Sequence, residues 1–476
     1  MQENLDKFSE ECGVMGIFGV PQAAYLAYQG LYQLQHRGQE SAGVATDFES
    51  QIYIHKNMGL VSEVFSGFDF KKLPGDIAIG HNRYSTTGSS LLSNAQPLFM
   101  ESRFGMLALA HNGNLVNAGS LRKTLQNEGS IFQTSSDSEV MVHLLTKSKE
   151  KEFVEAMKQA LSQVTGAFCI TALVSGKLIA ARDPMGFRPL CLGKLHEGWA
   201  IASETCAFDL IGAEYVREIE PGEILLISKE QGLVSHHLPK AKRQARCIFE
   251  FIYFSRPDSV IFDSNCDKVR RAMGRQLARE ETMKGGDIVI SVPDSSNTAA
   301  LGYSEESGIR FELGLIRNHY VGRTFIKPNQ DARALSVKLK YNPVKGVLRG
   351  KRIILVEDSI VRGTTLKELV KLIKACGSKE VHIRVASPPI ISPCFFGIDL
   401  STKKEIIASN KTIQEISDYV GADSLQYLSL KGMLDVAPGP SEHYCVGCFT
   451  EEYPVPPPEN FTKGMMESKE RELGKF

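Results

Sequence analysis

The chain has 476 residues, more than one hydrophobic core usually supports, so two domains are expected. Hydrophobic residues make up 42% and charged residues 23% of the chain, which excludes a disordered or fibrous protein. The 55 basic and 55 acidic residues cancel, so the charge gives no support for a nucleic-acid partner.

The chain begins with an acidic leader, MQENLDKFSEE, at residues 1–11. It lacks the basic and apolar parts of a signal peptide, and no apolar run approaches the roughly 20 residues that span a bilayer. We therefore expect a cytoplasmic protein with no membrane partner. The ten Cys residues are accordingly interpreted as thiols, metal ligands or catalysts and not as a disulfide framework.

Residues 12–235 are predicted to form the first domain. Short apolar runs such as ALALAHNGNL alternate with Gly, Asn and Asp turns, which is typical of an α+β domain with layered sheets covered by helices. If residues 1–11 are a propeptide, their removal gives Cys12 a free α-amino group. With a pKa of about 8, that amine can act as the base for the Cys12 thiol. The alternative is that Cys12 is a small core residue.

A basic stretch, SHHLPKAKRQAR, breaks this pattern, and residues 236–259 are predicted to be a surface linker. Over residues 260–453, apolar strands alternate with amphipathic helices, as in KRIILVEDS followed by LKELVKLIKACG. This order predicts an α/β domain whose parallel sheet is covered on both faces and binds ligands at the carboxyl ends of its strands. Residues 454–476 are predicted to be a weakly ordered tail.

The run VEDSIVRGTT lies between a predicted strand and a predicted helix. Its backbone N–H groups and the helix N-terminus can bind a phosphate monoester. The residues expected at this phosphate are Ser359, Arg362, Gly363, Thr364 and Thr365. The preceding acids, Glu357 and Asp358, suit ribose hydroxyls and Mg²⁺. The alternative is an acidic turn that caps a helix.

This segment resembles the fingerprint of type I phosphoribosyltransferases, and its SIVRGTT half resembles the glutamine phosphoribosylpyrophosphate amidotransferases in particular. That family usually has two Asp residues where this chain has Glu357 and Asp358, a departure that could alter the ribose or metal geometry. The run VPDSS follows another predicted strand. By the resemblance, Ser295 in this run contributes to the Mg²⁺ site.

The run NHYVGRTF and the basic stretch after it resemble the family's loop that closes over pyrophosphate. Cations suit an anionic leaving group, and the resemblance implies this role for Arg323 and Lys327. His319 stands where the family usually has Arg, so the positive charge at that point is expected to be weaker.

Five motifs occur in order and resemble the amidotransferases with N-terminal nucleophiles: CGVMGIFG, QHRGQESAG, HNRYSTTG, AHNGN and TSSDSE. By that resemblance Arg83 binds the α-carboxylate of glutamine and Asp137 binds its α-amino group. Asn112 and Gly113 would form the oxyanion hole. The residues expected to support this pocket are Arg37, Tyr84, Ser85 and Thr86.

These residues also have ordinary interpretations. Arg37 could form a surface ion pair, Asn112 and Gly113 could form a hairpin turn, and Asp137 could cap a helix. Asn82 replaces an apolar residue that is more usual in its motif, and we expect the exchange to be tolerated.

Cys445 and Cys448 form a C-x-x-C, while Cys247 and Cys394 stand apart from them. Four thiolates can bind Zn²⁺ or a [4Fe–4S] cluster, and this scattered spacing does not choose between them. One branch of the resembled family, which also has an acidic leader, carries a [4Fe–4S] cluster on Cys at these positions. The resemblance therefore implies that cluster, in a structural role, with structural Zn²⁺ or unligated thiols as alternatives.

The two sets of motifs together predict an N-terminal-nucleophile (Ntn) glutaminase domain followed by a type I phosphoribosyltransferase domain. The implied enzyme converts glutamine, water and phosphoribosylpyrophosphate to 5-phosphoribosylamine, glutamate and pyrophosphate, the committing step of purine synthesis, with ammonia crossing inside the protein. The glutaminase motifs alone would also suit glucosamine-phosphate or asparagine synthesis. The rivals are a regulator that binds phosphoribosylpyrophosphate without turnover and a degenerate amidotransferase. Purine nucleotides are expected as feedback inhibitors, and the chain is expected to form a homo-oligomer.

Overall fold

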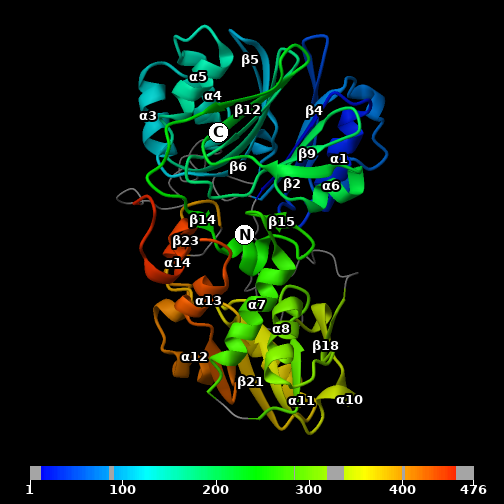
Figure 1. The fold of residues 1–476 in the computed structure, drawn as a ribbon, viewed down its shortest axis with the longest axis vertical. Coiled ribbons are helices and arrows are strands. Elements are labelled where there is room, and N and C mark those ends of the chain that lie inside the picture. Colours follow the sequence, from blue (N-terminus) through cyan, green and yellow to red (C-terminus); the bar gives the residue numbers. More distant parts are fainter. Residues whose placement is uncertain (1–11, 85–90, 283–284, 319–336, 399–401, 457–476) are drawn as a thin grey trace, which may run out of the picture.

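The computed structural model describes residues 12–84, 91–282, 285–318, 337–398 and 402–456, which form two lobes joined at a narrower middle (Figure 1). The N-terminal lobe carries two sheets with helices outside them, and the C-terminal lobe carries the sheet that contains β21. Several predicted features lie outside the described residues: the propeptide at 1–11, Ser85, Thr86, His319, Arg323, Lys327 and the tail beyond residue 456.

The first sheet of the N-terminal lobe is antiparallel and has seven strands. In spatial order they are β11 (Glu214–Glu218), β9 (Cys191–Lys194), β10 (Trp199–Ala202), β1 (Gly13–Phe18), β4 (Ile77–Arg83), β2 (Ser41–Phe48) and β3 (Gln51–Met58). Strand β1 lies in the middle, buried along its whole length. The sheet thereby carries the residue just before β1, Cys12, into the interior.

The second sheet is also antiparallel and has six strands. In spatial order they are β13 (Gly232–His237), β12 (Glu223–Ser228), β8 (Lys177–Arg182), β7 (Gly166–Val174), β6 (Gly105–Leu115) and β5 (Leu98–Ser102). The inner faces of the two sheets share one apolar core, to which β1 contributes Val14, β6 contributes Ala108 and β8 contributes Leu178. Small residues such as Gly16, whose Cβ would lie 3.2 Å from Leu178, allow this close approach.

Helices cover the outer faces of both sheets. On the first sheet lie α1 (Ala23–Gln33), α2 (Val61–Val64) and α6 (Cys206–Ile211), and on the second lie α3 (Ala118–Asn127), α4 (Ser138–Lys147) and α5 (Phe153–Leu161). Two short turns, η1 (Phe70–Lys72) and η2 (Leu92–Asn94), complete the lobe. The resulting helix–sheet–sheet–helix layering confirms the predicted α+β class.

The middle of the molecule is built from short elements. Strand β14 (Arg246–Cys247) pairs in parallel with β23 (Tyr444–Cys445), and β15 (Val260–Ile261) pairs with β16 (Ser264–Asn265). Between β14 and β15 lies the π-helical turn η3 (Glu250–Phe254), in which most residues are buried. The part of the predicted linker that follows Arg246 is therefore core between the lobes and not a surface segment.

The C-terminal lobe contains a four-stranded parallel sheet. Its strands are β17 (Ile288–Ser291), β20 (Arg352–Glu357), β21 (Glu380–Val385) and β22 (Ser424–Tyr427). A separate antiparallel ribbon joins β18 (Leu315–Arg317) to β19 (Tyr341–Pro343). Continuous apolar strands alternating with helices predicted this parallel sheet, and the structure confirms it.

Both faces of this sheet are covered. One face packs on α7 (Cys266–Arg279), α8 (Asn297–Ser307) and α13 (Leu430–Val436), and the other packs on α11 (Thr364–Ala375) and α12 (Ile413–Val420). The remaining short helices are α10 (Lys345–Leu348), α14 (Gly447–Thr450), η4 (Ile407–Ser409) and η5 (Ser441–His443). Side chains fix several helix starts, as where Thr412 and Glu415 form a capping box on α12.

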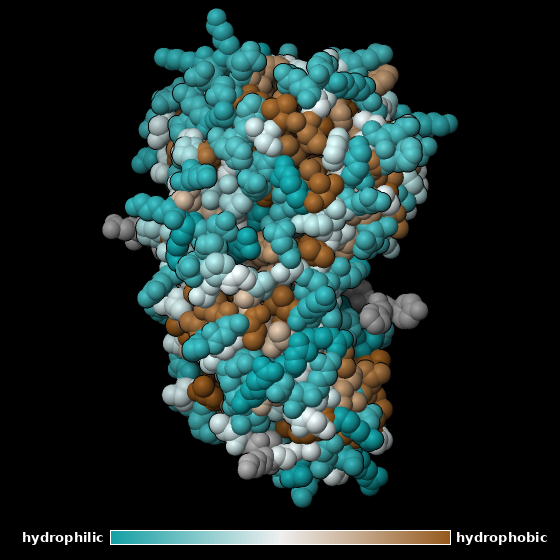
Figure 2. All heavy atoms as spheres, in the orientation of Figure 1, coloured by the Kyte–Doolittle hydropathy of each residue, from teal (hydrophilic) through white to brown (hydrophobic). Residues whose placement is uncertain are grey.

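The face of the molecule in Figure 2 is largely hydrophilic, and its apolar atoms gather in several separate patches on both lobes. None of the helices within the described ranges is both long enough and apolar enough to cross a membrane.

Candidate active sites

Cys12 lies immediately before β1, and its side chain is buried, with 7% of its surface exposed. Its thiol donates a hydrogen bond to the carbonyl oxygen of Tyr84 at 3.5 Å. Tyr84 directly follows Arg83, the last residue of the neighbouring strand β4, and Arg83 is also buried. The pairing of β1 with β4 thus brings together the predicted nucleophile and the predicted ligand of the glutamine carboxylate.

The surroundings of Cys12 favour the protonated thiol. Burial raises the pKa of Cys12 to about 11, while a backbone hydrogen bond with Tyr84 and the charge of Arg83 act in the opposite direction. The carboxylates of Asp137 and Glu40 raise the pKa further. Nucleophilic attack from this thiol at neutral pH therefore requires a base beside it.

Asn112 and Gly113 lie within the long strand β6 and do not form a hairpin turn, so the ordinary interpretation of this pair is wrong. The side chain of Asn112 is 1% exposed, and its Nδ2 has no hydrogen-bond partner among the described residues. Gly113 has φ 148°, and a Cβ there would lie 2.1 Å from the carbonyl oxygen of Ala167. The strand therefore holds a buried amide donor beside a position that requires glycine.

Asp137 occupies the N-cap position of α4, but its side chain makes no capping hydrogen bond. Its Oδ2 instead accepts a hydrogen bond from the backbone N–H of Leu115 at 2.9 Å, and its Oδ1 lies 3.9 Å from Nδ1 of His111. Both partners belong to β6, the strand of Asn112. The carboxylate is thus fixed beside the predicted oxyanion donors, and burial lowers the pKa of His111, which favours the neutral imidazole.

Arg37 is not the surface ion pair of the ordinary interpretation. Its side chain is 1% exposed, its Nη2 donates to Glu250 Oε2 at 2.5 Å, and its Nε donates to Glu204. Although burial alone would raise the pKa of Glu204, the charges of Arg37 and His36 hold it well below its usual range. Arg37 therefore joins the N-terminal lobe to η3 by buried ion pairs, and no local pattern pointed to Glu204 or Glu250.

Asn82 faces away from solvent and donates from Nδ2 to the carbonyl oxygen of Leu34 at 2.6 Å. A Cβ at Gly13 would lie 2.3 Å from Asn82 Oδ1, so the amide fills the space that the glycine leaves. This packing explains why a polar residue is accommodated in that motif.

The predicted phosphate loop follows β20 and leads into α11. Gly363 occupies the N-cap position of α11 with φ 75°, a left-handed conformation that glycine adopts without strain. The loop borders a hollow that is partly open to solvent. Its lining residues are Glu357, Ser359, Ile360, Val361, Gly363, Thr365 and Leu366.

The acidic pair at the end of β20 is buried and held by hydroxyl groups. Ser296 Oγ donates to Glu357 Oε1 at 2.9 Å and lies 3.4 Å from Asp358 Oδ2, while Ser359 Oγ donates to Asp358 Oδ1 at 2.6 Å. Ser295, the predicted Mg²⁺ ligand, is the partly exposed neighbour of Ser296. The pairing of β17 with β20 brings these two loops to the same edge of the sheet.

The other predicted phosphate contacts are less enclosed. Arg362 is partly exposed, and its Nη2 lies 3.3 Å from Glu405 Oε1. The two ends of the segment predicted to close over pyrophosphate meet at the β18–β19 ribbon, where Asn318 N donates to the Lys340 carbonyl at 2.9 Å. Arg323 and Lys327 lie between these ends, outside the described residues.

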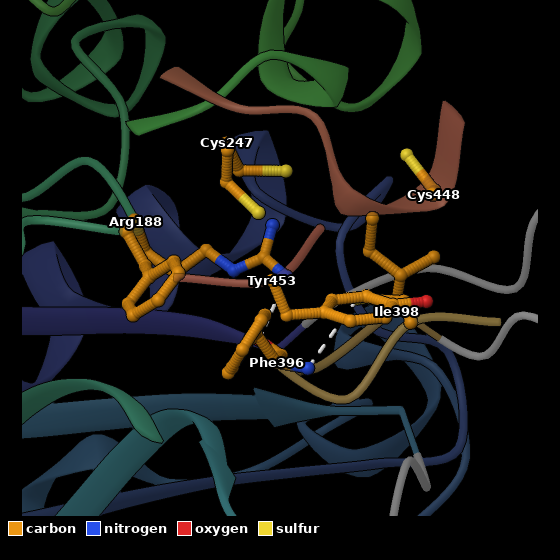
Figure 3. A pocket seen from close by; sticks show the side chains of 9 residues that line it. Arg188, Cys247, Phe396, Ile398, Cys448 and Tyr453 are labelled. Atoms are coloured by element: carbon orange, nitrogen blue, oxygen red, sulfur yellow. Dashed lines mark hydrogen bonds between the residues drawn. The ribbon is translucent and has the colours of Figure 1, made fainter. Parts of the chain in front are cut away.

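A third site lies between the lobes and is lined by all four predicted cluster ligands (Figure 3). It is partly open to solvent, and its lining residues are Phe187, Arg188, Cys247, Cys394, Phe396, Ile398, Cys445, Cys448 and Tyr453. The pairing of β14 with β23 sets Cys247 opposite Cys445. We call this space the cysteine cavity.

The four thiols surround the cysteine cavity without converging on one point. Across the described part of the chain, no three His, Cys, Asp or Glu side chains lie close enough to hold one metal ion together. Burial raises the pKa of Cys445 to about 12, and Cys394 lies close enough to raise it further. Phe187 and Arg188 come from the N-terminal lobe, so this cavity is not confined to the second domain as the sequence predicted.

Two protein families match the chain. Residues 81–209 match the glutamine amidotransferase domain, and residues 306–388 match the phosphoribosyl transferase domain. The chain is 49% identical to the amidophosphoribosyltransferase of Archaeoglobus fulgidus over 94% of this chain and 98% of that protein. It is 47% identical to the amidophosphoribosyltransferase of Bacillus subtilis over 96% of each chain.

Solved structures agree over nearly the whole length. The glutamine phosphoribosylpyrophosphate amidotransferase of Bacillus subtilis, complexed with ADP and GMP, superimposes with a TM-score of 0.89 and 45% identity, covering 95% of this chain and 99% of that one. A structure described as the allosteric regulatory enzyme of purine biosynthesis gives a TM-score of 0.90 and 46% identity, covering 95% and 98%.

Proposed function

Because the chain belongs to the amidophosphoribosyltransferase family, we propose that Cys12 releases ammonia from glutamine and that the loop after β20 uses this ammonia on phosphoribosylpyrophosphate. The family reaction, the first step of purine biosynthesis, yields 5-phosphoribosylamine, glutamate and pyrophosphate. The division of labour is supported by two features on one chain. One is a buried Cys12 together with the Asn112 amide, whose Nδ2 has no partner among the described residues, and the other is an acidic pair at a phosphate loop.

The glutaminase half begins with removal of residues 1–11, which gives Cys12 a free α-amino group. That amine accepts the thiol proton, and the sulfur attacks the side-chain amide carbon of glutamine. The amine then returns the proton to the leaving nitrogen, so that ammonia departs and a thioester remains. Water hydrolyses the thioester to glutamate and restores the thiol. The raised pKa of Cys12 supports this account, since the buried thiol needs an adjacent base.

Negative charge develops on the amide oxygen during both steps. The side-chain Nδ2 of Asn112 and the backbone N–H of Gly113 donate to that oxygen. The burial of Asn112 and the lack of a partner for its Nδ2 among the described residues support this role. Arg83 binds the α-carboxylate of glutamine and Asp137 binds its α-amino group, and Tyr84 orients the thiol through its carbonyl group.

In the phosphoribosyl half, backbone N–H groups of the loop bind the 5-phosphate at the N-terminus of α11. Glu357 and Asp358 bind the ribose hydroxyls, and Ser296 fixes the orientation of both carboxylates. Their oxygen donors also suit Mg²⁺, which would be held by this pair with Ser295 and would neutralise charge on the pyrophosphate. Arg323 and Lys327 bind the leaving pyrophosphate.

The cysteine cavity brings together four Cys side chains, the number that a [4Fe–4S] cluster or a structural Zn²⁺ takes. Four sulfurs at about 2.3 Å from one Zn²⁺ lie close together, and a cubane cluster separates its four thiolates more widely. These Cys positions and the acidic leader resemble the branch of the family that carries a [4Fe–4S] cluster, and all four side chains line one cavity. We therefore assign a [4Fe–4S] cluster to Cys247, Cys394, Cys445 and Cys448. Such a cluster would hold β14, β23 and the segment at Cys394 together.

The nucleotides in the related Bacillus subtilis structure, ADP and GMP, support the expectation that purine nucleotides inhibit this enzyme. Assembly into a homo-oligomer and location in the cytoplasm remain predictions from the sequence.

The function is tested by measuring pyrophosphate release with each substrate omitted in turn. We expect release only when phosphoribosylpyrophosphate and Mg²⁺ are present with either glutamine or ammonium salt. Glutamate and pyrophosphate should appear in equal amounts with glutamine. Glutamate formation without any pyrophosphate release would refute the assignment.

A further inference from the structure

We propose that Asn114 is a positioning residue for glutamine hydrolysis, through which the segment 394–397 of the C-terminal half holds the oxyanion donors in place. The proposal rests on the assignment of Asn112 and Gly113 as those donors. It also gives the segment that follows Cys394 a role in the chemistry of the other domain, beyond holding the fold together.

The first observation is a hydrogen bond between distant parts of the chain. Asn114 Nδ2 donates to the carbonyl oxygen of Phe395 at 2.8 Å. Asn114 is 5% exposed and directly follows Gly113 in β6, and Phe395 directly follows Cys394. The bond therefore joins the end of the oxyanion strand to the edge of the cysteine cavity, across 281 positions of sequence.

The second observation is direct backbone contact at the same place. A Cβ at Gly397 would lie 3.4 Å from the carbonyl carbon of Gly113 and 3.5 Å from its Cα. On the opposite side, a Cβ at Gly113 would lie 2.1 Å from the carbonyl oxygen of Ala167 in β7. Gly113 is partly exposed, but its own sheet and the C-terminal segment are both close neighbours that limit how its peptide group can turn.

The segment that makes these contacts is itself held on several sides. Phe396 N donates to Cys394 Sγ at 3.3 Å, and Arg188 Nη2 donates to the Phe396 carbonyl at 2.8 Å. The rings of Phe187 and Phe396 stack with centroids 4.5 Å apart. Figure 3 shows Arg188 and Phe396 together at the cysteine cavity. A shift at Cys394 would therefore be passed on to Phe395 and Asn114.

An oxyanion hole works only when its donors point at the position where charge develops. Loss of one donor lowers the turnover number about 100- to 1000-fold, and small misplacements lower it less. Without the Asn114 bond, the peptide groups at Asn112 and Gly113 lose a fixed neighbour but keep their donors. We expect Asn114→Ala to lower kcat for glutamine hydrolysis about tenfold while KM for glutamine stays within about twofold.

The matched control is Asn117→Ala. Asn117 Nδ2 also donates to a backbone carbonyl, that of Gln163, at 2.9 Å, but this contact stays inside the N-terminal lobe. We expect Asn117→Ala to change kcat by less than about twofold. Ammonia-dependent synthesis and the melting temperature of Asn114→Ala should match those of the control, because the second site and the fold remain whole.

Two further variants complete the test. Gly397→Ala places a methyl group against Gly113 at a residue with φ 113°, and it should also reduce glutamine hydrolysis more than ammonia-dependent synthesis. Asn112→Ala removes a donor outright and should cost about 100-fold or more.

Equal kcat values for Asn114→Ala and Asn117→Ala, with a large loss in Asn112→Ala, would overturn the positioning role alone. Wild-type kcat in Asn112→Ala would overturn the oxyanion assignment as well. A separate readout is the affinity for glutamate γ-semialdehyde, whose aldehyde adds the Cys12 sulfur at carbon and so places an oxygen in the oxyanion position. Affinity for this probe should fall about tenfold in Asn114→Ala while affinity for glutamate does not change. Equal loss for both ligands would contradict the proposal.

Discussion

The two predicted active sites differ in how much of each is enclosed. Around Cys12, the side chains of Arg83, Asn112 and Asp137 are all buried. At the phosphate loop the acidic pair is buried, but the predicted phosphate contacts Ser359, Arg362 and Thr365 are partly exposed. One site holds buried side chains, and the other lies partly open to solvent at the edge of a sheet.

This difference follows from the chemistry. A thioester and its oxyanion need donors in fixed positions and protection from bulk water, which a sandwich of two sheets supplies. Phosphoribosylpyrophosphate is large and highly charged, and it must enter and leave together with pyrophosphate, so its site must open. Substitutions near Cys12 should therefore act on single steps of glutamine hydrolysis, while those at the phosphate loop should act on substrate binding and nitrogen transfer.

The largest effect is expected from Cys12→Ala. Glutamine-dependent activity should fall at least about 1000-fold because the nucleophile is lost, while synthesis from ammonium salts should persist. The matched control is Cys376→Ser, which changes a thiol that donates to the Leu372 carbonyl at the end of its own helix and should leave both activities intact. If Cys12→Ala abolished both activities equally, the two sites could not be separate.

Asp358→Asn should produce the opposite pattern. Removing the charge weakens contacts to ribose hydroxyls and Mg²⁺, so ammonia-dependent synthesis should fall about 100-fold. Hydrolysis of glutamine measured without the second substrate should change little. The control is Asp418→Asn, an exposed acid on α12 that contacts Gln414. A wild-type rate of ammonia-dependent synthesis in Asp358→Asn would mean that the acidic pair only caps the turn before α11.

Loss of the cluster should affect both sites together, since the cysteine cavity lies between the lobes. Protein purified without air should be brown and contain about four irons per chain, and Cys445→Ser should lose them. Both activities should then fall about 10- to 100-fold. Cys266→Ser, a buried thiol outside the cavity, should keep its iron. A colourless zinc protein that is fully active in air would refute the cluster and leave the enzyme assignment intact.

The pH dependence of Cys12 alkylation tests how burial affects the Cys12 thiol before residues 1–11 are removed. Burial disfavours the thiolate and raises the pKa to about 11, so in a chain that retains residues 1–11 alkylation should be slow at neutral pH. Its rate should rise about tenfold per pH unit from pH 8 to 10, because the thiolate fraction does so below the pKa. A variant such as Glu11→Pro provides a chain that retains residues 1–11, and its intact mass confirms that they are present. A rate that levels off near pH 8 would contradict the raised pKa.

The smallest effect is expected from Glu357→Asp, which restores the usual acidic pair of the family. The shorter side chain loses its hydrogen bond from Ser296 but keeps its charge at the ribose site. We expect KM for phosphoribosylpyrophosphate to change by about fivefold, and Ser296→Ala to have a similar effect. A loss as large as that of Asp358→Asn would mean that the two acids share one role.

The fold class and the clustering of motifs could be predicted because they depend on local patterns. Strands of continuous apolar residues alternating with helices indicated the parallel sheet, and short motifs indicated which residues belong near Cys12. The partners of Arg37 could not be predicted, because Glu204 and Glu250 lie 167 and 213 positions away and carry no motif. The same holds for Ser296, whose contacts to Glu357 and Asp358 depend on the pairing of β17 with β20, and for the contact between Asn114 and Phe395, which depends on how the two lobes meet.

The central claim is that nitrogen passes inside the protein from the Cys12 site to the phosphate loop. It is tested most directly by supplying glutamine labelled with ¹⁵N in its side-chain amide, together with a large excess of unlabelled ammonium salt at a pH where most ammonia is protonated. The account predicts that phosphoribosylamine retains nearly all of the label while glutamine is being consumed. Label diluted in proportion to the ammonium pool would show that ammonia leaves the protein before it reacts, and would contradict the account.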